Sequence, residues 1–126
     1  MNLFKIQIVL ALFFIGMGNA VYAEDLNGIW KSDIETMIIY QDRNALKVVC
    51  SINYSSRPAI LYGEGTVLDN VVSVRTRISP STLPSGWEER GTLTLIVSAD
   101  GNSLSGKWET ESGSWSGPAT FKRVRP

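Results

Sequence analysis

Residues Leu104–Pro126 read L-S-G-K-W-E-T-E-S-G-S-W-S-G-P-A-T-F-K-R-V-R-P. The segment opens with the phrase Leu-x-Gly-x-Trp, which also occurs near the other end of the chain at Leu26–Trp30, L-N-G-I-W. In an extended strand these three side chains share one face, because successive residues point to opposite sides. The glycine lets a neighbouring backbone or bulky side chain approach closely, and the tryptophan fills the adjacent space. The repeat predicts that both ends of the chain meet at one crowded place, as closure of a β-barrel requires.

Three segments between these ends, 44–53, 70–78 and 91–98, alternate apolar and polar residues. A period of two is the mark of a half-buried strand. The expected inner-face residues are Leu46, Val48, Cys50 and Ile52 in the first segment, Val72, Val74, Thr76 and Ile78 in the second, and Leu93, Leu95 and Val97 in the third. No segment after Ala23 shows a sustained helical period, so we expect no long helix.

Turn-forming residues separate the apolar segments at short intervals. Asp100-Gly101 is the strongest hairpin signal, because this pair supports the positive φ that tight hairpins need. The predicted strands are 26–32, 35–41, 44–53, 59–67, 70–78, 90–98, 103–110 and 114–124. Consecutive strands joined by tight turns favour an up-and-down antiparallel order.

The fold class predicted from this pattern is all-β, a small closed antiparallel up-and-down barrel of about eight strands. Closing the sheet removes both of its edges, and a barrel of this size either packs shut or holds one small ligand. A two-sheet sandwich is the alternative architecture. The repeated Leu-x-Gly-x-Trp phrase favours the barrel.

The segment Pro58–Val67 admits two phases. One phase places Tyr62 and Glu64 in the interior together with Ile60, and makes Tyr62 a candidate ligand-binding residue. The other phase places Leu61 and Val67 inside. A buried carboxylate is costly unless it is paired or hydrogen-bonded, so the second phase is favoured.

The N-terminal segment 1–23 has the pattern of a secretory signal peptide. Met1–Lys5 carries one positive charge, Ile6–Gly18 is apolar, and Val21–Ala23 offers small residues at the positions that a signal peptidase recognises. The apolar run is shorter than the ~20 residues that span a bilayer, so we expect cleavage after Ala23 rather than a membrane anchor. The prediction is a periplasmic or secreted protein with a single domain, 24–126, and no membrane span after cleavage.

The composition excludes several classes of function. The chain has 12 basic and 12 acidic residues, and this balance gives no reason to expect nucleic acid as a partner. There is no histidine and only one cysteine, Cys50, so neither an internal disulfide nor a recognisable metal site is expected. Cys50 is predicted to be buried as a small hydrophobic residue. We expect no cofactor and no enzymatic activity.

Two segments of the chain resemble the calycin group of barrels, which includes lipocalins and avidins. Gly28-Ile29-Trp30 is similar to the Gly-x-Trp of the first strand in these families, and Trp115–Pro126 is similar to the final strand of avidins. The resemblance implies that Arg123 or Arg125 stacks across Trp30. Residues 44–53 contain no Tyr-Ser pair like that of the biotin site, so the resemblance implies a fold and a habit of binding small molecules, but not biotin. The residues assigned to barrel closure are Gly28, Trp30, Gly106 and Arg123.

The tryptophans are the leading candidates for a binding site. Trp87 lies in the longest predicted loop, Ser79–Glu89, and loops on a rigid scaffold often carry binding residues. Trp108 and Trp115 either line a cavity or fill the core, whereas Trp30 is expected to seal the floor of the barrel. The predicted function is an exported, non-catalytic binding protein that holds a small apolar or aromatic molecule between Trp87, Trp108 and Trp115. The alternative is an envelope interaction factor, of the inhibitor or immunity type, that contacts a protein partner through the 79–89 loop.

Overall fold

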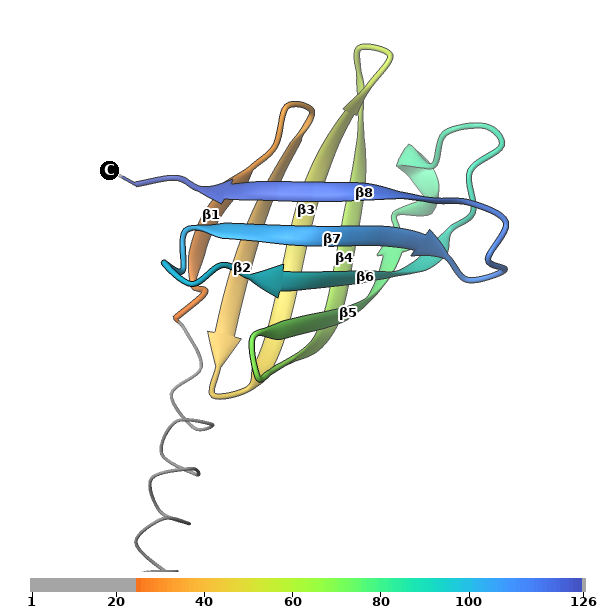
Figure 1. Cartoon of the computed structure of the whole chain (residues 1–126). Coiled ribbons are helices and arrows are strands. Elements are labelled where there is room, and N and C mark those ends of the chain that lie inside the picture. The colour runs from red at the N-terminus through yellow and green to blue at the C-terminus, as the bar shows by residue number, and fades with distance from the viewer. Residues whose placement is uncertain (1–24, 126) are drawn as a thin grey trace, which may run out of the picture.

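The computed structural model describes residues 25–125, which form eight strands and one short 3-10 turn. The strands are β1 (Gly28–Lys31), β2 (Glu35–Asp42), β3 (Ala45–Tyr54), β4 (Arg57–Leu68), β5 (Val71–Ile78), β6 (Arg90–Val97), β7 (Ser103–Thr110) and β8 (Ser116–Arg123), and the turn is Pro80–Thr82. Each strand pairs antiparallel with the next, and β8 pairs with β1 to close the barrel (Figure 1). The predicted fold class is therefore confirmed. The predicted signal peptide lies outside the described residues, and no helix within 25–125 is long and apolar enough to cross a membrane.

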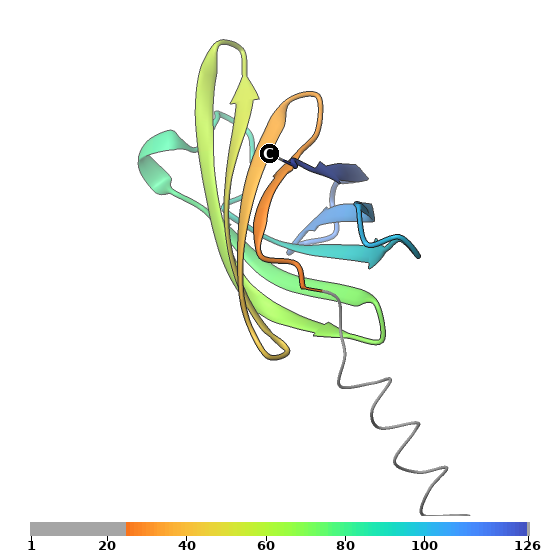
Figure 2. The same cartoon turned by 90° about the vertical axis from the view of Figure 1, so that its left-hand side faces the viewer.

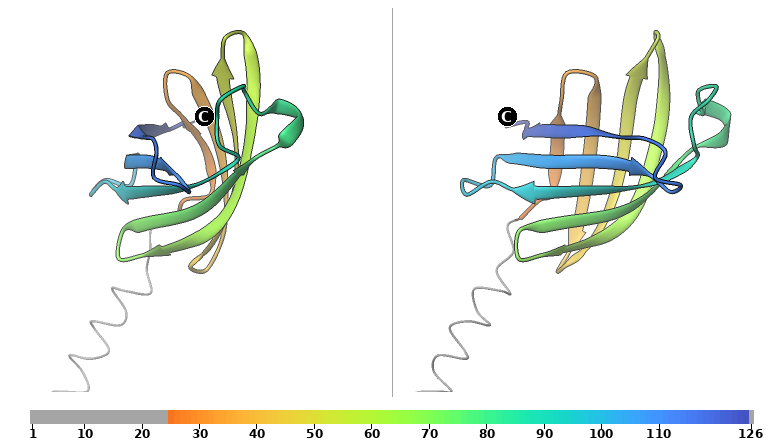
Figure 3. Two further views of the ribbon diagram at one scale, coloured as in Figure 1. Left: turned by 90° about the vertical axis from the view of Figure 1, so that its right-hand side faces the viewer. Right: turned by 45° about the vertical axis from the view of Figure 1, so that its right-hand side comes forward.

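The strands on the two sides of the barrel run in different directions and cross each other (Figure 1). Strands β1–β4 run along one side, and β6–β8 run across them on the other, with β5 turning between the two groups (Figure 1). Figure 2 shows the two groups facing each other across the interior. The up-and-down order places alternate connections at the same end of the barrel. We name the end with the connections 32–34, 55–56, 79–89 and 111–115 the open end, and the opposite end the closed end (Figure 3).

The predicted inner faces of β3, β5 and β6 are confirmed. Every residue assigned to them in the sequence is at most 9% exposed. In β4 the second of the two phases is correct, because Leu61 and Val67 are buried whereas Tyr62 is 42% exposed on the outer face. The phase that placed Tyr62 inside the barrel is therefore wrong.

The hairpin between β3 and β4 is tighter than the sequence suggested. The strands were expected to end at residue 53 and to restart at 59, but β3 runs to Tyr54 and β4 begins at Arg57. The turn consists of Ser55 and Ser56 alone, with φ of 48° and 66°. Positive φ at both central positions defines a turn that normally carries Asn or Gly, so two serines gave no signal for it.

Trp30 lies in the core, on the strand that pairs with β8 to close the barrel. Its side chain is fully buried, and Nε1 donates a hydrogen bond to the carbonyl oxygen of Leu26 at 2.9 Å. The guanidinium of Arg123 lies 4.4 Å from the indole centroid, which is a cation–π contact. The same guanidinium donates to the carbonyl oxygens of Asp25 at 2.7 Å and Gly101 at 3.0 Å. Arg123 therefore joins the start of the domain, the β6–β7 turn and the floor tryptophan.

The two glycines of the repeated phrase serve different purposes. A Cβ on Gly106 would collide with the carbonyl oxygen of Thr94 on β6, so close approach of a neighbouring backbone requires glycine there. A Cβ on Gly28 would meet nothing within 4 Å, but its φ of +130° is strained for other residues. Both ends of the chain do meet, because β1 pairs with β8 and closes the barrel. The tryptophans of the two phrases nevertheless lie apart. Trp30 pairs with Arg123 and Trp108 pairs with Gly117, which lie at opposite ends of β8.

Candidate functional site

A cavity of about 550 Å³ occupies the open end of the barrel. Trp87, Trp108 and Trp115 all line it, so the structure brings the three predicted residues together. Its remaining walls include apolar residues of β3, β4, β6 and β8. The cavity is open to solvent at its rim, where Trp115 is 54% exposed and Tyr54 is 46% exposed.

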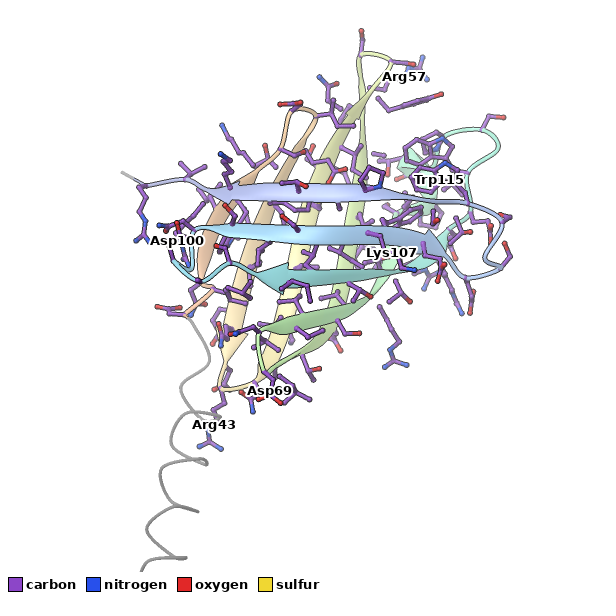
Figure 4. All side chains as sticks on the ribbon, in the orientation of Figure 1. Arg43, Arg57, Asp69, Asp100, Lys107 and Trp115 are labelled. Carbon is purple, nitrogen blue, oxygen red and sulfur yellow. The ribbon has the colours of Figure 1, made fainter. Side chains whose placement is uncertain are left out.

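Trp108 and Trp115 form one aromatic pair, with ring centroids 5.4 Å apart and planes tilted by 54°. Trp108 extends from the inner face of β7, and its Nε1 donates to Oγ1 of Thr76 at 3.2 Å. Figure 4 shows Trp115 where the chain enters β8, at the end of the β7–β8 hairpin remote from Asp100. Each of these two indoles packs closely against a glycine, where a larger residue would clash with the ring. A Cβ on Gly91 would lie 2.9 Å from the Trp108 ring, and one on Gly117 would lie 2.7 Å from the Trp115 ring.

Trp87 and Tyr54 form a second aromatic pair, with centroids 4.9 Å apart. Trp87 is partly buried and packs against the core, so the 79–89 loop folds back over the mouth of the barrel. The loop is held to β4 through Thr82, whose Oγ1 accepts a hydrogen bond from the Ile60 amide at 3.0 Å and donates to the Ser79 carbonyl at 3.0 Å. The loop thus has a defined position over the cavity.

Glu88 connects this loop to the β7–β8 turn at the rim. Its carboxylate accepts hydrogen bonds from the Ser112 hydroxyl at 2.5 Å, the Ser114 hydroxyl at 2.6 Å and the Ser112 amide at 3.2 Å. The bonds from Ser112 and then Ser114 stabilise the charged form and lower the pKa of Glu88 to about 2. Glu88 is therefore ionised at neutral pH and places a negative charge beside the opening.

Glu35 and Cys50 lie side by side in the wall of the cavity. The Cys50 thiol donates to Oε2 of Glu35 at 3.9 Å, a weak hydrogen bond. Burial raises the pKa of the Glu35 carboxyl, because the charged form loses its solvation. Burial, reinforced by the neighbouring Glu35, raises the pKa of Cys50 to about 12. The predicted burial of Cys50 is confirmed, since the residue is 3% exposed.

Tyr62, the fourth predicted ligand-binding residue, does not line this cavity. It lies on the outer surface of β4 in a shallow groove with Arg75 and Arg77. Its register neighbours, Val49 and Arg77, also point outward. Tyr62 is therefore not part of the cavity at the open end.

Sequence reasoning missed Glu35 and Tyr54 as cavity residues. The signal for both was present in the strand alternation. Glu35 lies two residues before the buried Met37 on β2, and Tyr54 lies two residues after Ile52 on β3. Each residue therefore continues the inner face of its strand. At the open end this inner face reaches solvent, so polar and partly exposed side chains are tolerated there.

Residues 25–125 contain no group of three His, Cys, Asp or Glu side chains that could hold a metal ion. Taken together, the fold and the site define a small closed antiparallel barrel with an aromatic-lined cavity at one end. Comparison with protein-family models, with curated proteins and with solved structures gives no match. The closed eight-strand barrel is compatible with a calycin-like fold.

Proposed function

We propose that this protein is an exported, non-catalytic binding protein that holds a small apolar or aromatic molecule in the cavity at the open end. The observation that carries the proposal is the cavity itself, about 550 Å³ in volume and lined by three tryptophans. Pockets of about 300–1,000 Å³ with mostly apolar walls and a few polar groups are the usual form of small-molecule sites. The rigid, hydrogen-bonded barrel around the cavity reduces the conformational entropy lost on binding.

The conformation of the 79–89 loop favours a small molecule over a protein partner. An inhibitor acting through this loop would present Trp87 and Glu88 outward, as an anchor and a charge. Instead Trp87 packs against the core, and Glu88 is bound to Ser112 and Ser114. Both side chains are committed to the wall and rim of the cavity.

Two ionisable groups of the site, Glu88 and Cys50, are poorly suited to catalysis at neutral pH. A general acid or base works best with a pKa near the operating pH, whereas the pKa of Glu88 is about 2 and that of Cys50 is about 12. Glu88 stays ionised and Cys50 stays a thiol at neutral pH. A nucleophilic cysteine requires the thiolate form.

The calycin-like assignment and export belong to the same proposal. The Arg123–Trp30 stack agrees with the contact that the calycin resemblance implied. Export rests on the signal-peptide pattern of residues 1–23.

A fluorescence titration with N-phenyl-1-naphthylamine tests the proposal, because this neutral dye brightens in apolar sites. We expect saturable binding with one dye per chain. Trp115→Ala should weaken binding about tenfold, since it removes one ring of the aromatic pair. Tyr62→Ala, which removes an aromatic residue from the outer face, is the matched control and should bind like the wild type. Absence of saturable binding, or equal losses in the two variants, would contradict the proposal.

A further inference from the structure

The charged groups that line the cavity are of one sign. Glu35 lies in its wall and Glu88 at its rim, and neither Lys nor Arg is among the residues that line it within the described chain. The described ion pairs involve Glu89 and Glu109, which lie outside this cavity. The site is therefore electrostatically negative, although its walls are mostly apolar.

Among residues 25–125, no strong hydrogen-bond donor contacts the Glu35 carboxylate. Its side-chain partner in the structure is the Cys50 thiol, at 3.9 Å, and a thiol is a weak donor. Glu35 is half-buried, and a carboxylate that has lost part of its hydration is costly unless it is paired or hydrogen-bonded. A hydrogen bond from a ligand donor to Glu35 would therefore contribute more binding free energy than the same bond to a fully exposed carboxylate.

The aromatic residues of the cavity favour the same kind of ligand. The faces of indole and phenol rings carry partial negative charge and attract cations within about 6 Å of the ring centroid. Tyr54, Trp87, Trp108 and Trp115 supply four such rings in two tilted pairs. A cation bound in this cavity would therefore meet aromatic rings as well as a carboxylate among its lining residues.

We propose that the ligand is a hydrophobic amine: an alkyl or aryl body that fills the tryptophan-lined cavity and a protonated amino group that donates to the Glu35 carboxylate. An anionic ligand is disfavoured, because it would pass the fixed negative charge of Glu88, which Ser112 and Ser114 hold in place. An alcohol of the same shape would gain the apolar contacts but not the charge attraction. This inference rests on the proposed function, since it assigns the chemical class of the molecule bound in that cavity.

Isothermal titration calorimetry with three ligands of matched shape tests the inference. The probes are 2-(1-naphthyl)ethylamine, 2-(1-naphthyl)ethanol and 3-(1-naphthyl)propionate at pH 7, titrated into protein expressed from the full sequence. We expect the amine to bind at least tenfold more tightly than the alcohol, and the carboxylate to bind most weakly. An alcohol that binds as tightly as the amine would overturn the inference and leave the proposed function standing. Failure of all three to bind would overturn both.

Two variants test which carboxylate is responsible for the tighter binding of the amine than of the alcohol. Glu35→Gln keeps the side-chain volume and should reduce amine affinity about tenfold while changing alcohol affinity less than about twofold. Alcohol binding thus also reports that the variant is folded. Glu88→Gln, at the exposed rim, should weaken amine binding only about two- to threefold, because solvent screens its charge. Retention of the full amine preference in Glu35→Gln would show that this carboxylate does not bind the ammonium.

Discussion

Replacement of Trp30 tests whether this residue seals the barrel. Removal of a large buried aromatic side chain costs about 3–5 kcal/mol, and Trp30 is fully buried. The substitution also removes the hydrogen bond to the Leu26 carbonyl and the ring beneath Arg123. We therefore expect Trp30→Ala to lie at the upper end of that range, which is a large part of the ~5–15 kcal/mol stability of an ordinary domain.

Two companion variants separate packing from hydrogen bonding. Trp30→Phe keeps a ring below Arg123 but leaves the Leu26 carbonyl without its donor, which costs about 1–3 kcal/mol. Trp115→Ala removes an indole that is 54% exposed and should cost less than about 1 kcal/mol. Urea unfolding followed by far-UV circular dichroism gives the three free energies, and avoids fluorescence signals that change with the tryptophans themselves. A loss below about 1 kcal/mol for Trp30→Ala would refute the assignment of Trp30 as the barrel floor.

Four further predictions concern the walls and turns of the barrel. The Cys50 thiol, with its pKa raised to about 12 by burial, should react with Ellman's reagent at pH 8 only after unfolding in urea; a native rate like that of free cysteine would show that it is accessible. Burial raises the pKa of Glu35, so the folded state binds the carboxyl proton more tightly than the unfolded state does. Proton binding by Glu35 therefore stabilises the folded protein at pH values below the unfolded pKa. This stabilisation is lost as the pH rises through the folded pKa. Glu35→Gln should accordingly stabilise the protein at pH 8, with a gain that shrinks towards pH 4; a gain independent of pH would contradict the assignment. Ser55→Asn combined with Ser56→Gly should raise the free energy of unfolding by about 0.5–1 kcal/mol, because Asn-Gly suits the positive φ of both positions, and a loss in urea unfolding would contradict this turn geometry. Gly106→Ala should destabilise by about 1–3 kcal/mol, since its Cβ would collide with a backbone carbonyl of β6, and a thermal midpoint equal to that of the wild type would disprove the close approach.

Much of the fold could be predicted from the sequence because burial on one face leaves a period of two. Leu46, Val48, Cys50 and Ile52 alternate with polar or exposed residues, and the same holds for β5 and β6. The turn at Ser55-Ser56 could not be predicted, because serine has no intrinsic preference for positive φ. Its conformation is imposed by the long pairing of β3 with β4, which brings Tyr54 opposite Arg57.

The candidate site was only partly predictable. Trp87, Trp108 and Trp115 were identified as cavity residues because large aromatic side chains in a small domain are few and need a partner surface. Their arrangement in two pairs depends on how β3, β7 and the 79–89 loop meet in space, which no local pattern encodes. Glu35 was overlooked because an acid at a strand end normally faces solvent, whereas here the inner face of β2 continues to the cavity wall.

Native mass spectrometry of the protein, purified gently from the cells that produce it, tests most directly whether the cavity holds a small molecule. We predict a species heavier than the polypeptide by a few hundred daltons, with the extra mass lost on denaturation. The denatured mass should also correspond to residues 24–126, as cleavage after Ala23 requires. The bare mass of the polypeptide, or a stable complex with a second polypeptide in place of a small molecule, would contradict the proposed function.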